Sequence, residues 1–271
     1  MIPVLCFALL AVLFGVLMVT AAGMSLLSAI LLSVLVFLLL HVVYLLIFWL
    51  ASLPVPMDRP IEKENRLCHF ACGSVISIVN FYAGIHATVS GVEKLPTESR
   101  FLMVGNHRSI FDPLIVMDKL RRYHIAFVSK PENFSIPIAG RIAHAAGFLT
   151  IDRENDRNAL KSILIAADYL KRGVCNMAIY PEGTRSKTEE MLPFHAGSLK
   201  IAQKAMVPIV VTAVHGTDKL YRFRPFSGVR VRLNILEVIP AETVCAMKTT
   251  ELSGRIRAMI QADLDRDKEV S

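Results

Sequence analysis

The apolar positions divide the chain into two parts of different character. Residues 2–19 and 26–53 are almost wholly apolar, and no Asp, Glu, Lys or Arg occurs before Asp58. Each run is long enough to cross a bilayer as a helix, because a spanning helix takes about 20 apolar residues. Gly23, in the short link between the runs, can break a helix. The pattern therefore predicts a membrane-anchoring helical hairpin over residues 1–57, with both ends on one side.

Basic residues directly after the hairpin indicate its orientation. Arg59, Lys63 and Arg66 follow the second run, and by the positive-inside rule they place residues 58–271 on the cytoplasmic face of the membrane. A cleavable signal peptide is a second interpretation, although the amino end has no Lys or Arg and another apolar run follows at once. A hairpin embedded in one leaflet is a third, because length alone does not exclude it.

A few small and polar residues predict how the two helices of the hairpin meet. Ser25, Ser28, Ala29 and Ser33 supply small side chains for close packing. His41 is the one strongly polar side chain of the second run, and we expect it to be neutral and packed against the partner helix.

Beyond the hairpin, strand-like and helix-like patterns alternate. Apolar, β-branched runs predict buried strands. A period-two alternation predicts a further strand, at an edge or half buried, from which Arg230, Arg232 and Asn234 face outward. Strands alternating with helices indicate an α/β domain over residues 58–271, with a central mixed or parallel sheet flanked by helices. The predicted strands are 86–95, 100–106, 123–130, 145–153, 174–180, 207–215 and 228–236, and the predicted helices are 67–83, 113–122, 158–172, 198–205 and 249–266.

The composition agrees with this division and restricts the classes of molecule that the protein is expected to bind. The chain is 54% apolar and 20% charged, and its formal net charge of +7 lies wholly after residue 57. A basic domain tied to an apolar anchor suits anionic lipid headgroups or an anionic substrate. Nucleic acid is disfavoured as a partner, because the sequence has no zinc-finger spacing, basic heptad or RNA-binding aromatic motif.

The five cysteines predict neither disulfides nor a metal site. Their number is odd and their spacing shows no disulfide framework. Cys68, His69 and Cys72 have the residue types of metal ligands, but no second ligand pair stands at a suitable spacing. Reduced, buried thiols facing the cytosol are the expected state.

The first candidate site is the segment NHRSIFD, which places His107 and Asp112 five residues apart between a predicted strand and a predicted helix. Asp112 precedes Pro113, an arrangement typical of a helix N-cap. If the loop folds back, the carboxylate reaches one imidazole nitrogen and leaves the other free to take a proton. Ser109 lacks the G-x-S-x-G elbow of a serine nucleophile. A base that activates a substrate hydroxyl is the simplest chemistry, and a structural role for the pair is the alternative.

The second candidate site is the segment YPEGTRS, which follows another predicted strand. Gly183 lets the backbone approach a ligand closely, Thr184 can donate a hydrogen bond, and Arg185 can hold a phosphate with two hydrogen bonds. Lys130 and Arg153 each also follow a predicted strand, and ligands of α/β proteins collect at the carboxyl ends of strands. These side chains are predicted to line one anion site, with a polar surface turn as the alternative.

Together these segments resemble the glycerolipid acyltransferases, most closely the 1-acyl-sn-glycerol-3-phosphate (lysophosphatidic acid) acyltransferases. NHRSIFD matches the first block of the family, N-H-x4-D, and GFLTIDR, YPEGTRS and VPIVVTAVHG look like the second, third and fourth blocks in the expected order. The resemblance covers residues 85–220. Arg108 stands where glutamine is common in the family, and Tyr180 replaces a frequent phenylalanine.

The resemblance implies transfer of an acyl group from acyl-CoA or acyl-carrier protein to the sn-2 hydroxyl of lysophosphatidic acid, which gives phosphatidic acid. It implies no metal, no cofactor and no covalent intermediate. His107 is then the general base and Asp112 its orienting partner. The residues that it implies for the acceptor and its phosphate are Lys130, Arg153, Glu182, Gly183, Thr184 and Arg185.

Other functions stay open at this point. An acyltransferase that uses glycerol-3-phosphate or another lysolipid would keep the mechanism and change the acceptor. A membrane lipid-binding protein without catalytic activity would keep the fold, although binding alone needs no positioned base. A hydrolase would pass the acyl group to water.

Overall fold

The computed structural model describes residues 2–63, 65–151, 156–188, 190–220 and 224–270. In this part of the chain, seven strands form one sheet in the order β1-β7-β6-β2-β5-β3-β4. Neighbouring strands run parallel except β6 and β7. The predicted α/β class with a mixed, largely parallel sheet is therefore confirmed. The strands are β1 His86–Ser90, β2 Leu102–Gly105, β3 Ile125–Ser129, β4 Leu149–Thr150, β5 Asn176–Ile179, β6 Ile209–His215 and β7 Arg230–Ile239.

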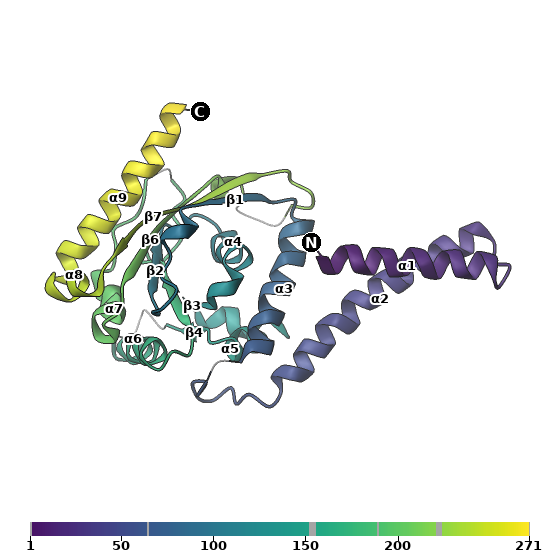
Figure 1. Ribbon diagram of the computed structural model, residues 1–271, viewed down its shortest axis with the longest axis horizontal. Coiled ribbons are helices and arrows are strands. Elements are labelled where there is room, and N and C mark those ends of the chain that lie inside the picture. The colour runs from purple at the N-terminus through teal and green to yellow at the C-terminus, as the bar shows by residue number, and fades with distance from the viewer. Residues whose placement is uncertain (1, 64, 152–155, 189, 221–223, 271) are drawn as a thin grey trace.

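Helices cover both faces of this sheet, as Figure 1 shows. Each helix predicted from the sequence is present, and α5 and α8 are additional. One face carries α3 Arg66–Tyr82, α4 Phe111–Lys119 and α5 Ala139–Ala145, and the other carries α6 Asp156–Lys171, α7 Lys200–Ala205, α8 Ala241–Ala246 and α9 Thr249–Val270.

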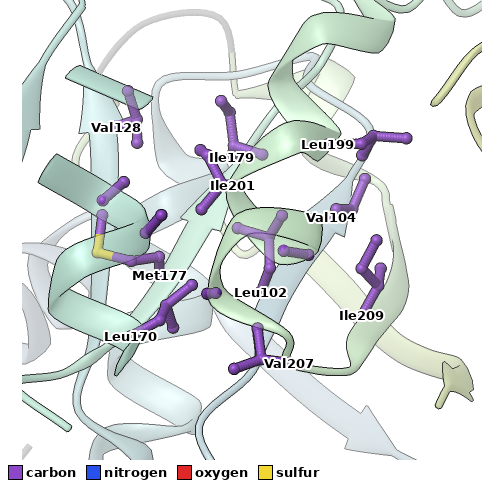
Figure 2. Packing of buried hydrophobic residues seen from close by; sticks show 14 of the residues in the cluster. Leu102, Val104, Val128, Leu170, Met177, Ile179, Leu199, Ile201, Val207 and Ile209 are labelled. Carbon is purple, nitrogen blue, oxygen red and sulfur yellow. The ribbon is translucent and has the colours of Figure 1, made fainter. Parts of the chain in front are cut away.

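The central strands are apolar throughout because they are buried on both faces. Side chains alternate along a strand, so Leu102 and Val104 of β2 join the core on the α6–α9 side while Met103 joins the core on the α3–α5 side. Figure 2 shows the first of these cores, where Met177 of β5 and Ile209 of β6 flank Leu102.

The strand with period-two alternation, β7, is half buried as predicted but is not an edge strand. Arg230 and Arg232 are exposed and Asn234 is partly buried. However, β1 pairs with β7 along its outer side and forms the edge itself. The outward-facing polar side chains of β7 therefore indicate that one face of the strand is solvated. They do not indicate that the strand lacks a neighbour on one side.

The predicted hairpin consists of α1 Ile2–Thr20 and α2 Leu26–Ser52, which project away from the sheet (Figure 1). By length and composition, both helices could cross a membrane. Ala29 and Ser33 lie at the helix contact as predicted. A Cβ atom at Gly15 of α1 would lie 2.2 Å from Ser33 Oγ, so the two helices approach closely at this glycine.

The two other predictions for the hairpin have opposite outcomes. Ser25 and Ser28 are exposed, and Ser25 caps α2 by accepting the N–H of Ser28, so their predicted place in the contact is wrong. His41 packs on Phe7 of α1, with ring centroids 4.9 Å apart, which confirms the predicted contact. Its Nε2 also lies 3.1 Å from the hydroxyl of Tyr82 on α3.

Candidate active site

The two predicted site segments lie side by side at one edge of the sheet. β2 and β5 are neighbouring parallel strands, so their carboxyl ends meet at the same edge. Residues 106–110 leave β2 there, and residues 180–188 leave β5. β3, which precedes Lys130, is the neighbour of β5 on its other side.

Asp112 holds His107 through a single carboxylate oxygen. Asp112 Oδ2 lies 2.8 Å from His107 Nδ1 and also accepts the N–H groups of Arg108 at 2.7 Å and Ser109 at 2.8 Å. Asp112 is fully buried, whereas the side chain of His107 is 19% exposed. Because a carboxylate only accepts hydrogen bonds, Nδ1 carries a hydrogen, and in the neutral imidazole Nε2 holds the lone pair.

The predicted N-cap role of Asp112 is wrong. The helix α4 begins at Phe111, its N-cap is Ile110, and Asp112 lies in the first turn. The carboxylate instead folds back over the preceding loop and binds two of its N–H groups. This is the loop closure that the spacing of His107 and Asp112 predicts.

Glu182 ties the two loops together. Its Oε1 accepts the N–H of His107 at 2.7 Å and its Oε2 accepts the N–H of Leu192 at 2.8 Å. The N–H of Ser186 in turn donates to the carbonyl of His107 at 2.8 Å. Burial raises the pKa of the Glu182 carboxyl group, although the two N–H donors oppose the rise. The sequence predicts Glu182 at the acceptor site, but gives no sign of this contact with His107.

Two buried polar residues fix the loop of His107 from the other side. Asn106 Nδ2 donates to the carbonyl of Val214 at 3.0 Å, and its Oδ1 accepts the N–H of the same residue at 2.8 Å. Ser109 Oγ donates to the carbonyl of Leu220. Ser109 is fully buried, so the structure uses it as an anchor of the loop.

Arg108 braces neighbouring loops. Its Nη2 donates to the carbonyl of Thr188 at 3.3 Å, and its Nη1 lies 3.8 Å from Asp218 Oδ1. The side chain is 16% exposed. The positive charge that the sequence places next to His107 is therefore partly balanced by Asp218.

Tyr180 fixes the plane of the imidazole. Its ring stacks on that of His107, with centroids 4.4 Å apart and 4° between the planes. The ring of Phe127 of β3 also stacks on Tyr180, at a centroid distance of 5.5 Å. Burial first, and the charge of Asp112 second, raise the pKa of the phenol well above its usual range, so Tyr180 is neutral. No sequence pattern reports this contact, because stacking depends on strands β2 and β5 being neighbours.

The middle of the YPEGTRS segment turns outward, between the buried Gly183 and the buried Ser186. The N–H of Gly183 donates to the carbonyl of Tyr180 at 3.0 Å, and Gly183 has a φ of +74°, which favours glycine. Thr184 and Arg185 follow this turn and are exposed. Their polar groups are therefore available to a ligand at the edge of the sheet.

Of the other two predicted cations, the structure describes only Lys130. Lys130 is exposed directly after β3. Arg153 lies outside the described residues.

An apolar cavity of about 380 Å³ opens beside the Gly183 turn. Tyr180 and Gly183 line one side, and Leu160 and Ile163 of α6 line another. A larger cavity of about 860 Å³, lined in part by Arg230, contains none of the predicted site residues. Within the described ranges, no group of three or more His, Cys, Asp or Glu side chains could hold a metal ion.

Comparison with known proteins shows that the chain is similar to acyltransferases. Residues 86–215 match the family model described as Acyltransferase, and this stretch contains both site loops. The predicted resemblance and the predicted enzyme class are thereby confirmed.

Particular relatives are more specific. The chain is 29% identical over 217 residues to the 1-acyl-sn-glycerol-3-phosphate acyltransferase alpha of Ovis aries. This alignment covers 78% of this chain and 74% of the relative. The chain is 31% identical over 173 residues to the 1-acyl-sn-glycerol-3-phosphate acyltransferase of Cocos nucifera, covering 64% and 54%. The crystal structure of the 1-acyl-sn-glycerophosphate (LPA) acyltransferase PlsC from Thermotoga maritima superposes with a TM-score of 0.61 at 19% identity, covering 97% of this chain and 95% of that one. This last likeness supports the fold.

Proposed function

We propose that the protein transfers an acyl group from acyl-CoA or acyl-carrier protein to the sn-2 hydroxyl of lysophosphatidic acid, giving phosphatidic acid. The observation that carries the proposal is the bond of 2.8 Å between His107 Nδ1 and Asp112 Oδ2. It leaves Nε2 as the proton acceptor on a partly exposed ring, in a chain similar to enzymes named for this acceptor.

The base activates the hydroxyl of the acceptor, which is a poor nucleophile on its own. His107 Nε2 takes the proton of the acceptor hydroxyl while the hydroxyl oxygen forms a bond to the thioester carbonyl carbon. Asp112 stabilises the imidazolium through Nδ1–H. The tetrahedral intermediate then loses its C–S bond, and the leaving thiolate receives the proton from Nε2. A positioned base of this kind contributes about 10²–10⁴-fold to the rate.

Charged and backbone groups around the base would hold the substrates. Arg185, Lys130 and Arg153 bind the phosphate of the acceptor, and Arg185 can do so with two hydrogen bonds. The N–H of Gly183 is already engaged in its turn, so we assign the developing oxyanion to the N–H groups after it, those of Thr184 and Arg185. Glu182 acts by holding His107 in place. No metal or organic cofactor takes part in these steps.

The apolar hairpin gives this reaction its location. Residues 1–57 act as the membrane anchor and residues 58–271 as the acyltransferase domain. The basic residues Arg59 and Lys63 place that domain on the cytoplasmic face. A membrane enzyme meets a lysolipid acceptor where that lipid resides.

An acyl-transfer assay tests the proposal. Purified full-length protein is given labelled acyl-CoA or acyl-carrier protein with lysophosphatidic acid, glycerol-3-phosphate or other lysolipids, beside His107→Ala. We expect phosphatidic acid from the wild type and none above background from the variant. Product with another acceptor alone would keep the mechanism and reject the substrate. Free fatty acid without any acceptor would indicate a hydrolase, and no turnover at all would favour a lipid-binding protein.

A further inference from the structure

A turn next to the site exposes two isoleucines. Residues 134–140, here called the isoleucine turn, lead from the short helix after β3 into α5. Ile136 is 52% exposed and Ile138 is 37% exposed. The turn leaves the same sheet edge as the loop of His107, because β3 is parallel to β5 and β5 to β2. Ile110, on that loop, is itself 45% exposed.

The backbone of the turn has a fixed and unfavourable shape. Ile138 has a φ of +66°, a conformation that β-branched residues rarely adopt. A Cβ atom at Gly140 would lie 2.2 Å from the carbonyl oxygen of Phe134. The N–H of Gly140 also donates to the carbonyl of Ile136 at 2.9 Å. Strained backbone of this kind persists where the surrounding structure holds it, often at functional positions.

The turn is fastened to the end of the apolar hairpin. Arg141, directly after it, donates from Nη2 to the carbonyl of Leu53 at 2.6 Å. His144 Nε2 donates to the carbonyl of Pro56 at 2.9 Å. Leu53 and Met57 are themselves 42% and 40% exposed. The exposed apolar surface of α2 therefore continues past its end towards the isoleucine turn.

Charged side chains of both signs accompany this surface. Arg59, Lys63 and Lys130 are exposed there, and so are Asp58, Glu62 and Glu132. Arg59 lies 4.0 Å from Glu62. Exposed apolar side chains flanked by charged groups suit the boundary between the acyl chains and the headgroups of a bilayer.

We propose that the isoleucine turn inserts Ile136 and Ile138 into the lipid of a membrane beside α2, and so docks the carboxyl edge of the sheet on the bilayer surface. His107 then faces the membrane. The acceptor lysolipid keeps its acyl chain in the bilayer while its headgroup reaches the base. This consequence rests on the proposed function, but the insertion itself does not.

A fluorescence experiment on the full chain tests the insertion. Trp49 is the single tryptophan, so Trp49→Phe provides a background in which Ile136→Trp is the only reporter. Met206→Trp is the matched control, because Met206 is 69% exposed with a φ of +55° and precedes β6, at the opposite edge of the sheet. In vesicles of phosphatidylcholine and phosphatidylglycerol with brominated chains, we expect quenching at position 136 and none at 206. Equal quenching at the two positions, or none at 136, overturns the proposal.

A kinetic experiment separates docking from catalysis. We expect Ile136→Asn with Ile138→Asn to lower transfer to long-chain lysophosphatidic acid in vesicles about tenfold, since burial of one isoleucine corresponds to a factor of that order. Transfer to a short-chain acceptor dissolved as monomers should not change, and Met206→Asn should change neither. An equal loss on both acceptors contradicts docking. If the wild type acylates no lysophosphatidic acid, the proposed function fails, while the quenching result still decides the insertion.

Discussion

His107 and His215 each lie 2.8 Å from an aspartate oxygen, and they stand at the ends of neighbouring parallel strands, β2 and β6. The partner of His107 is five residues away, in the helix that follows its own loop. The partner of His215 is Asp263, 48 residues away on α9. His215 has an exposed side-chain fraction of 7%, against 19% for His107.

The surroundings of the two carboxylates explain why equal distances do not mean equal roles. Asp112 is fully buried, and two backbone N–H groups aim its oxygen at Nδ1, which leaves Nε2 for a substrate. Asp263 meets Nε2 itself and also accepts from Asn234 Nδ2 at 2.9 Å. The first pair is arranged around a nitrogen that stays available, and the second links a strand to a helix.

Replacing each of the two histidines should give the largest difference between the pairs. His107→Gln should lower kcat for acyl transfer by about 10²–10⁴-fold, because the base is lost. His215→Gln should leave kcat within about threefold and lower the free energy of unfolding by about 1–3 kcal/mol, because a buried hydrogen bond between β6 and α9 is disturbed. Steady-state kinetics and denaturant unfolding of both variants check this. A large loss of kcat in His215→Gln would contradict the assigned roles.

The second prediction concerns the exposed cations in the loop after β5, which lies beside the loop of His107. Arg185→Met should raise KM for lysophosphatidic acid about ten- to a hundredfold, the value of charge-assisted hydrogen bonds to a phosphate. Lys187→Met, an exposed cation in the same loop, is the control and should change KM little. With an uncharged monoacylglycerol acceptor, the difference between the two variants should vanish. A persistent difference would mean that Arg185 does not act through the phosphate.

The third prediction concerns Glu182, whose carboxyl group accepts a hydrogen bond from the N–H of His107. Burial raises the pKa of Glu182, so the folded protein holds this proton more tightly than the unfolded chain. Its contribution to stability is then fully present below the usual pKa of a glutamate and is lost as pH rises through the folded pKa. Unfolding of wild type and Glu182→Gln across this window should show the wild type losing stability relative to the variant. A relative gain on raising the pH would show the opposite shift.

The smallest effect concerns the ring stacked on His107. Tyr180→Phe keeps the stack and should leave kcat within about twofold, whereas Tyr180→Ala should lower it about two- to tenfold, the range measured for aromatic pairs. Steady-state kinetics of the two variants checks this. A larger loss in Tyr180→Phe than in Tyr180→Ala would assign the function to the hydroxyl instead of the ring.

The sequence predicts the fold well where burial imposes a pattern. The central strands are buried on both faces, so their continuous apolar runs mark them. The amphipathic helices α6 and α9 each span several turns and show a clear apolar face. The helices α5 and α8 have only 7 and 6 residues, which is too short for a helical period to stand out.

The site divides in the same way between local and distant contacts. The His107–Asp112 bond joins a loop to the helix that directly follows it, so spacing predicts it. Glu182 reaches His107 across 75 residues, and no short pattern encodes a contact that depends on strand order. The pair of His215 and Asp263 is likewise invisible in the sequence, although His215 ends a predicted strand.

The most direct test of the account replaces each aspartate by its neutral isostere. Asp112→Asn can present its amide group to His107 and disturb the tautomer that leaves Nε2 free, while Asp263→Asn changes a contact between β6 and α9. Acyl transfer to lysophosphatidic acid is measured for both variants beside wild type, with unfolding as the check on folding. We expect a loss of about 10²-fold or more in kcat for Asp112→Asn and near-wild-type kcat for Asp263→Asn. Comparable losses in both, or full activity of Asp112→Asn, would show that the two pairs do not have the roles assigned to them.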